Sequence, residues 1–196
     1  ERGIKAERDD IKVNVMGVNH FTWLDKVTYM GEDLIPLYKE AIEKNSSAFD
    51  CASDDNWINN VFATDHSVKR DLFKRYGIVA AAGDRHLAEF VPGKWYLKDP
   101  DTVKSWHFGL TTVNWRQFKD LPERIEKQNK RASGEEKLEL RNTGEESVRQ
   151  MKAILGLGDI VTNVNLPNRG QIPNLPLGAV VETNAYFTAG QLTPVF

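Results

Sequence analysis

Two side chains that can bind a metal or a substrate follow an apolar run near the start of the sequence. The run from Val15 to Val18 leads directly into Asn19 and His20. Neutral imidazole is the commonest side-chain ligand of transition metals, and an amide offers a ligand both a donor and an acceptor. A histidine at a strand end can equally be held by backbone hydrogen bonds, and the pair taken alone favours that structural interpretation.

A second polar cluster follows Gly83, where Asp84, Arg85 and His86 precede Glu89. Carboxylate and imidazole groups both suit proton abstraction. The cluster begins a predicted short helix, so Asp84 can instead act as a helix N-cap, and Arg85 with Glu89 as an ion pair on one helix face. Two interpretations therefore stay open: the polar wall of a pocket for an anionic or hydroxylated ligand, and an ordinary helix start.

A third segment, residues 163–176, is rich in amides and proline. Four asparagines, Asn168 among them, share a proline-constrained loop with one glutamine and one arginine, between two predicted strands. These side chains suit sugar hydroxyls. The same residues also suit tight turns, because Asn and Gly tolerate unusual dihedrals and Pro fixes its own.

The elements that must position these residues mix strands and helices without strict β-α-β alternation. Apolar periodicity predicts strands at residues 11–19, 21–29, 160–164 and 179–183. It predicts helices at residues 34–44 with Asp33 as N-cap, and at 57–76, 84–90, 115–131 and 135–155. Residues 45–56 are predicted to form a loop. The mixture indicates an α+β fold, a mixed or antiparallel sheet packed with long helices, in one domain spanning residues 1–196.

Composition narrows the function classes. A formal net charge of −2, from 26 basic and 28 acidic residues, gives no electrostatic case for nucleic acid or a membrane surface. No apolar run approaches the roughly 20 residues that span a bilayer. A lone cysteine, Cys51, excludes an intramolecular disulfide framework and is typical of a reducing compartment, so we expect a cytoplasmic protein. We expect His66 and His107 to serve packing.

The three polar segments together resemble the family 4 glycoside hydrolases, in both order and spacing. The segments are residues 14–23, 83–92, and 163–176 followed by 180–182. The resemblance covers nearly the whole chain. The form Ala-Ala-Gly-Asp-Arg-His-Leu-Ala-Glu-Phe, at residues 81–90, is most similar to the α-galacturonidase branch.

The resemblance implies a glycosidase that uses NAD⁺ and a divalent metal, usually Mn²⁺, on α-linked galacturonides. In this family the cofactor removes hydride from C3 of the sugar, a base takes the acidified C2 proton, and the aglycone is eliminated. The metal polarises the C2 and C3 oxygens. An α-glucosidase or α-galactosidase of the same family is an alternative, as is a non-catalytic fragment or oligomerisation module.

By that resemblance His20 is a metal ligand and Asn19 a neighbouring substrate-binding residue. The resemblance implies that the family's partner cysteine ligand and its Rossmann-type nucleotide-binding half lie upstream of Glu1. We therefore expect this chain to be the substrate- and metal-binding part of a longer homo-oligomeric enzyme, and to be inactive alone. The expected ligand is a small carbohydrate.

The sequence departs from the family pattern at the position of the catalytic base. Many members carry a tyrosine where Ile78 and Val79 stand here. Asp84 and His86 are therefore the candidate catalytic residues. Three further residues are predicted to bind substrate: Arg85, by pairing with a uronate carboxylate, Glu89 and Asn168.

Overall fold

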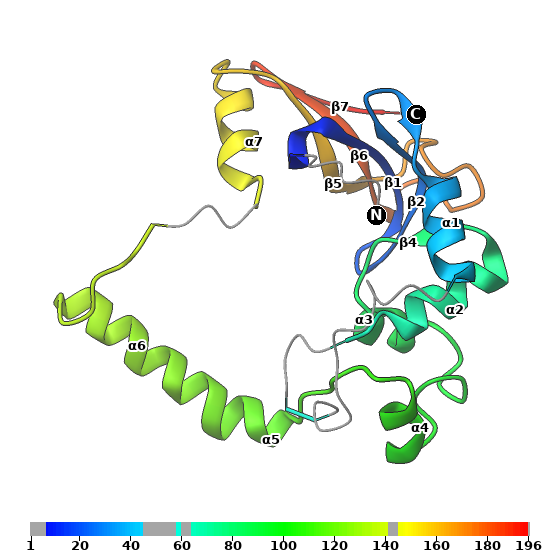
Figure 1. Ribbon diagram of the computed structural model, residues 1–196. Helices are drawn as coiled ribbons and strands as arrows, with labels where there is room; N and C mark the ends of the chain where they lie inside the picture. Colours follow the sequence, from blue (N-terminus) through cyan, green and yellow to red (C-terminus); the bar gives the residue numbers. More distant parts are fainter. Residues whose placement is uncertain (1–6, 45–57, 60–63, 141–144, 196) are drawn as a thin grey trace.

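The computed structural model describes residues 7–44, 58–59, 64–140 and 145–195 (Figure 1). These residues form an antiparallel sheet of seven strands, with helices gathered mainly at one end of it. The order is β3-β2-β1-β6-β5, with β4 beside β2 and β7 beside β6. The predicted α+β class is confirmed. Within the described ranges, no helix is long and apolar enough to cross a membrane.

The sheet is built from two hairpin units taken from opposite ends of the chain. The strands are β1 (Ile11–Val18), β2 (Phe21–Tyr29), β3 (Glu32–Asp33), β4 (Val79–Ala80), β5 (Ile160–Pro167), β6 (Val180–Thr188) and β7 (Gln191–Pro194). β1 joins β6 through the pairs Met16 with Thr183 and Gly17 with Glu182. Beyond that short ladder the Asn184 side chain continues the connection, because it accepts from the Val15 amide at 3.1 Å and donates to the Val13 carbonyl at 2.8 Å.

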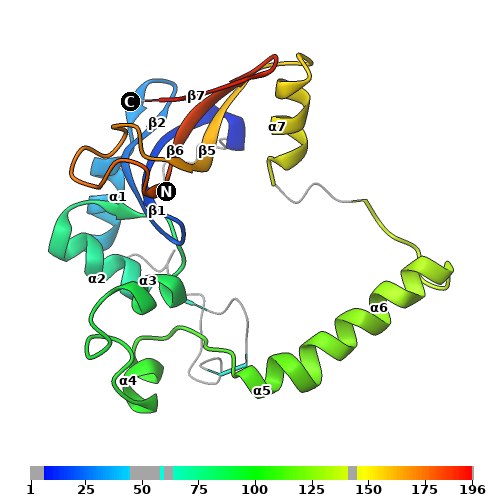
Figure 2. The ribbon, with the colours of Figure 1, turned by 180° about the vertical axis from the view of Figure 1, so that it is seen from behind.

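The helices differ in how close they lie to the sheet (Figure 1). Their bounds are α1 (Ile35–Glu43), α2 (Ser67–Tyr76), α3 (Asp84–Phe90), α4 (Pro100–Ser105), α5 (Val113–Trp115), a π-helical turn (Arg116–Asp120), α6 (Leu121–Ser133) and α7 (Ser147–Ile154). In both views α6 extends away from the sheet, whereas α2, α3 and α4 lie together (Figures 1 and 2). A 3₁₀ turn, Arg8–Asp10, precedes β1.

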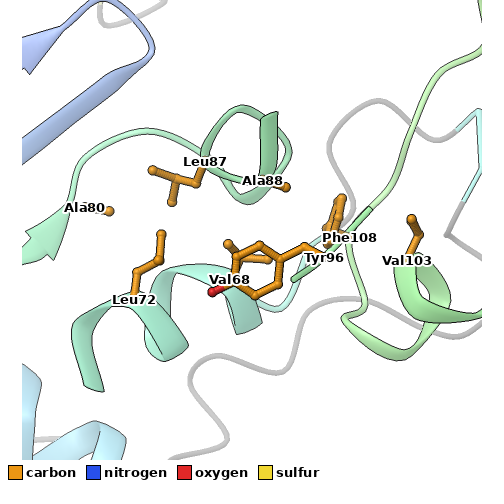
Figure 3. Close-up of a cluster of buried hydrophobic side chains, with 8 residues drawn as sticks. All are labelled: Val68, Leu72, Ala80, Leu87, Ala88, Tyr96, Val103 and Phe108. Carbon is orange, nitrogen blue, oxygen red and sulfur yellow. The ribbon is translucent and has the colours of Figure 1, made fainter. Parts of the chain in front are cut away.

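The main hydrophobic cluster packs α2, α3 and α4 against one another. Figure 3 shows its buried members, which are Val68, Leu72, Ala80, Leu87, Ala88, Tyr96, Val103 and Phe108. They come from α2, β4, α3, α4, the segment between α3 and α4, and the segment after α4, and Phe21 and Trp23 of β2 pack against them. Burying a leucine such as Leu87 stabilises the fold by about 2 kcal/mol. The cluster therefore holds α3 against the end of the first hairpin.

The turn of the first hairpin depends on a glycine. Gly17 has a φ of 148°, and a Cβ built there would lie 2.4 Å from the Phe21 carbonyl oxygen. Asn19 and His20 form the two-residue turn between the paired Val18 and Phe21, and His20 has a φ of 66°. Histidine is among the few residues enriched at positive φ. The close approach at Gly17 thus allows the tight turn that carries His20.

The strand predictions are confirmed in place, and the structure adds β7 and the short β3 and β4. β5 and β6 extend beyond the predicted 160–164 and 179–183, so Asn165, predicted to lie in the loop, is part of β5. The predicted N-cap role of Asp33 is wrong, because Asp33 lies in β3 paired with Thr28 while Leu34 is the N-cap of α1. The Asp33 carboxylate nevertheless accepts a hydrogen bond from the Ile35 amide at 3.0 Å.

Two predicted helices are too long. Of residues 57–76, the described part is helical only in Ser67–Tyr76, because Ile58 and Thr64 form β-bridges to Leu110 and Phe108. Of residues 135–155, only Ser147–Ile154 is helical within the described ranges. Leu138 and Leu140 are exposed there, so a helix through them would have no core to bury against. The predicted loop at 45–56 lies outside the described residues.

Alanine at Gly17 is expected to lower the free energy of unfolding by more than about 1 kcal/mol, because alanine is strained at positive φ and its Cβ would meet backbone. Gly31 is the matched control, since it has a φ of 88° and, apart from its two chain neighbours, no residue has a heavy atom within 4 Å of the place a Cβ would take. Denaturant unfolding of Gly17→Ala and Gly31→Ala compares the two. An equal loss in both variants would mean that the contact with Phe21 is unimportant.

Candidate active site

Two imidazoles from separate sequence motifs meet where the first hairpin touches α3. The ring centroids of His20 and His86 are 4.3 Å apart, with an angle of 37° between the planes. His20 is exposed at the hairpin turn and His86 is half-buried on α3. Asn19 is exposed beside His20. The structure thus brings the first two predicted motifs together.

An aromatic contact fixes this meeting point. Phe21, which follows His20, stacks on Phe90 at the end of α3 with centroids 5.2 Å apart and planes 7° from parallel. Trp23 meets the edge of Phe21 at 5.1 Å. Aromatic pairs of this kind contribute about 1 kcal/mol beyond their buried area. The stacking therefore joins the strand that follows His20 to the end of the helix that carries His86.

The surroundings of His86 favour its neutral form. Partial burial and then His20 lower the pKa of His86, and Arg85 lowers it further, whereas Glu89 acts to raise it. The Glu89 carboxylate lies 3.9 Å from Nδ1 of His86. A lowered pKa leaves the imidazole unprotonated near neutral pH, where it can accept a proton or bind a metal.

The described residues fit part of a metal site. His20 offers an imidazole from an exposed turn, and His86 stands beside it. Catalytic zinc sites, for comparison, use three protein ligands and an open position. Among the described residues, no group of three His, Cys, Asp or Glu side chains is close enough to hold an ion. Cys51 lies outside the described residues.

Asp84 faces away from the imidazole pair. The residue is 1% exposed, and its carboxylate accepts hydrogen bonds from the Thr64 hydroxyl at 2.9 Å and from the amides of Lys69 at 3.0 Å and Val68 at 3.2 Å. Burial raises the pKa of Asp84, and these hydrogen bonds oppose the rise. The carboxylate thereby joins the start of α3 to the first turn of α2, which is a positioning role.

Asn168 is 2% exposed and its amide is directed into its own loop. The Nδ2 group donates to the carbonyls of Ile172, Leu175 and Pro176, and Oδ1 accepts from the amides of Gly170 and Ile172. The strand register places this loop at the same end of the sheet as the first hairpin turn, because Pro167 pairs with Val180 and Glu182 pairs with Gly17. Asn168 therefore shapes a loop near the site with a buried side chain.

Two further residues, which the sequence did not single out, lie next to Arg85. Thr111 accepts hydrogen bonds at Oγ1 from Nη1 of Arg85 at 3.3 Å and from Nε of Arg116 at 2.6 Å. Burial lowers the pKa of Arg85, and the charge of Arg116 lowers it further, against the effect of Glu89. The sequence signal that could have pointed to them is the pair Thr111 and Thr112, since a threonine often precedes a helix and Thr112 is the N-cap of α5.

The imidazole pair, with Arg85 next to His86 on α3, lies at one end of the antiparallel sheet, and these groups are chemically suited to a small polar ligand and to acid–base chemistry. Residues 15–196 match the family described as "Family 4 glycosyl hydrolase C-terminal domain". The chain belongs to this glycosyl hydrolase family, which confirms the resemblance seen in the three sequence motifs.

Named relatives and solved structures agree with this assignment. The chain is 59% identical over 189 residues to an alpha-galacturonidase of Thermoanaerobacterium saccharolyticum, covering 96% of this chain and 40% of that protein. It is 43% identical to an alpha-galacturonidase of Bacillus subtilis, covering 96% and 41%. The chain thus spans about two fifths of the length of these relatives.

Two solved structures share the fold. The Bacillus subtilis protein lplD, described as a glucosidase, superposes with a TM-score of 0.85 at 40% identity, over 99% of this chain and 44% of that one. A 6-phospho-alpha-glucosidase from gut microorganisms, solved in complex with NAD and Mn²⁺, has a TM-score of 0.60 at 17% identity, over 97% and 41%.

Removing the Asp84 carboxylate is expected to destabilise the fold. Asp84→Ala leaves the buried amides of Val68 and Lys69 without their acceptor, so we expect a loss of about 3 kcal/mol in the free energy of unfolding. The control is Asp25→Ala, which removes one exposed hydrogen bond to Asn14. Denaturant unfolding checks both; a smaller loss for Asp84 than for Asp25 would contradict the positioning role.

The titration of His86 is expected to move in opposite directions in two variants. Glu89→Gln removes an anion that favours the imidazolium, so the pKa of His86 falls; Arg85→Gln removes a cation, so that pKa rises. Proton NMR of the imidazole from acid to mildly alkaline pH measures both shifts, and each is expected to stay within the roughly 1-unit scatter of protein histidines. Shifts of the same sign would disprove this arrangement of charges.

Proposed function

We propose that the full-length protein is a glycoside hydrolase that acts on α-linked galacturonides through C3 oxidation, C2 deprotonation and elimination of the aglycone. The observation that carries the proposal is the His20–His86 pair with Arg85 beside it. The names of relatives at 43–59% identity support the choice of sugar.

We infer the cofactors from a structure of the same fold that was solved with NAD and Mn²⁺. When bound, NAD would take up hydride from the sugar and the metal ion would polarise the sugar oxygens. His20 would supply one metal ligand, and residues of the whole protein beyond this chain would supply the others. This chain has no Gly-x-Gly-x-x-Gly run after a strand, so we assign nucleotide binding to the remainder of the protein.

In this proposal His86 is the group that accepts the C2 proton, because it is the partly accessible imidazole with a lowered pKa. Asp84 fixes the start of α3 and so the place of His86. Asn19 and Glu89, both exposed, bind sugar hydroxyls, and Arg85 binds the carboxylate. Asn168 contributes by holding the β5–β6 loop in shape.

A neutral sugar is the second candidate substrate. The chain is 25% identical over 186 residues to an alpha-galactosidase of Rhizobium meliloti, covering 87% of this chain and 34% of that protein. The same pair of imidazoles would serve a galactoside, since C2 and C3 are alike in both sugars. The two candidates differ at C6, where only the uronate carries a charge.

Turnover of α-linked galacturonides by the full-length protein with NAD⁺ and Mn²⁺ tests the proposal, with α-galactosides measured in parallel. His20→Asn is the informative variant, because asparagine tolerates the positive φ of the turn while removing the imidazole. We expect kcat/KM to fall by more than about 100-fold, since loss of a hydrogen-bond partner that only orients a metal ligand already costs about 10- to 100-fold.

Lys26→Ala, an exposed change on β2, should leave turnover unchanged. Near-normal activity of His20→Asn would refute the role of His20. A preference for galactosides would refute the choice of sugar.

A further inference from the structure

Two guanidinium groups from separate parts of the chain converge on one hydroxyl oxygen. Arg85 is the second residue of α3, whereas Arg116 follows α5, yet both donate to Oγ1 of Thr111, at 3.3 Å and 2.6 Å. A hydroxyl oxygen has two acceptor positions and one hydrogen. Both acceptor positions are taken by the arginines, so the hydrogen of Thr111 is left to donate. The three groups together form a set of donors.

The local structure builds this arrangement. Thr112 accepts from the Trp115 amide at 3.2 Å as the N-cap of α5, and its own amide donates to Oδ1 of Asn59 at 3.1 Å. The Arg116 amide then donates to the Thr112 carbonyl at 3.1 Å. These bonds fix the backbone next to Thr111, so the position of its hydroxyl is set by the fold.

Arg116 also begins the π-helical turn Arg116–Asp120 between α5 and α6. Single π-helical turns inside helices are rare and occur frequently at functional sites, because the extra residue changes the direction of the side chains that follow. The irregular turn here coincides with the arginine that reaches back to Thr111.

The charge of Arg116 has no counterion in the described part of the chain. Five other arginines each lie within 4.0 Å of a carboxylate: Arg70, Arg75, Arg124, Arg131 and Arg149. No such ion pair involves Arg116 among the described residues, although its side chain is directed by the hydrogen bond to Thr111. Two cations that share a neutral acceptor repel each other, and an anion placed against both would convert that repulsion into attraction.

The paired arginines adjoin the imidazole pair. Arg85 is followed directly by His86 on α3, and the His86 ring centroid lies 4.3 Å from that of His20. Because Arg85 and His86 are consecutive residues of α3, we assign an anionic group held by Arg85 and Arg116 to the same ligand that meets the two histidines. A uronate fits, because it carries one carboxylate and neutral hydroxyls on a single ring.

We propose that Arg85, Arg116 and Thr111 form a carboxylate-binding subsite, and that Arg116 is the residue that selects a charged sugar over a neutral one. This inference deepens the proposed function and rests on it for the identity of the sugar. A planar guanidinium fork matches a carboxylate bidentately, which an ammonium group cannot do. Arg116 is thus a specificity-determining residue, and Thr111 is the positioning residue that brings the two forks together.

The test compares an α-galacturonide with its methyl ester, which has the same ring and linkage without the charge. In the full-length protein with NAD⁺ and Mn²⁺, Arg116→Gln should lower kcat/KM for the acid by about 10- to 100-fold, mainly through KM. The value for the ester should change by less than about 3-fold, within the ordinary scatter of surface substitutions. Arg116→Lys should be intermediate, because it keeps the charge without the fork.

Arg124→Gln is the matched control. Arg124 lies on α6, which directly follows the π-helical turn of Arg116, and its exposed side chain is paired with Asp120 at 3.7 Å. This variant should leave both substrates unchanged. Equal losses on the acid and the ester in Arg116→Gln would overturn the proposal, as would no loss on either.

A binding measurement separates this inference from the proposed function. Calorimetric titration of the full-length protein with D-galacturonate and with D-galactose needs no turnover. Weaker galacturonate binding by Arg116→Gln, with galactose binding unaltered, supports the subsite even if no galacturonide is hydrolysed. Hydrolysis of galacturonides together with unaltered galacturonate binding in Arg116→Gln overturns the subsite and leaves the proposed function standing.

Discussion

The close approach of the backbone at Gly17 is the constraint on which the rest of the site depends. The backbone at Gly17 approaches the Phe21 carbonyl so closely that a Cβ would clash with it. Because glycine has no side chain, the hairpin can close with only Asn19 and His20 in its turn. The same glycine pairs with Glu182, and thereby joins the first hairpin to the second. Gly17 therefore takes part both in the hairpin turn and in the contact between the two hairpins, which Met16 and Asn184 complete.

The short helix α3 performs two tasks because its two faces differ. Asp84, Leu87 and Ala88 are buried, and they connect the helix to α2 and to the main hydrophobic cluster. Arg85 and His86 lie on the other face and remain partly accessible, as does Glu89 one turn further on. Helical periodicity thus gives these seven consecutive residues one buried face and one accessible polar face.

Local patterns predicted the elements that depend on local physics. The alternation of Phe21 to Tyr29 matches β2 residue for residue, and Gly77, at a φ of 70°, ends α2 as expected of a glycine after a helix. Two helices were predicted too long because contacts with distant segments, or the lack of them, decide the backbone conformation there. Ile58 and Thr64 have helical spacing but bridge to the segment at 108–110, and the charged stretch after Gly134 has no apolar surface to cover.

The sequence by itself determined the family, through three motifs in order, and it determined that an imidazole stands at a strand end and a polar cluster at a helix start. Only the tertiary structure decided what each polar side chain does. Asp84 and Asn168 point into hydrogen bonds with neighbouring backbone, His86 points to His20, and Arg116 reaches the threonine that also binds Arg85. The physical reason is that the contacts of Asp84, His86 and Arg85 join segments far apart in the chain, and those of Asn168 depend on how its loop folds back on itself, whereas strand, turn and cap preferences act over a few residues.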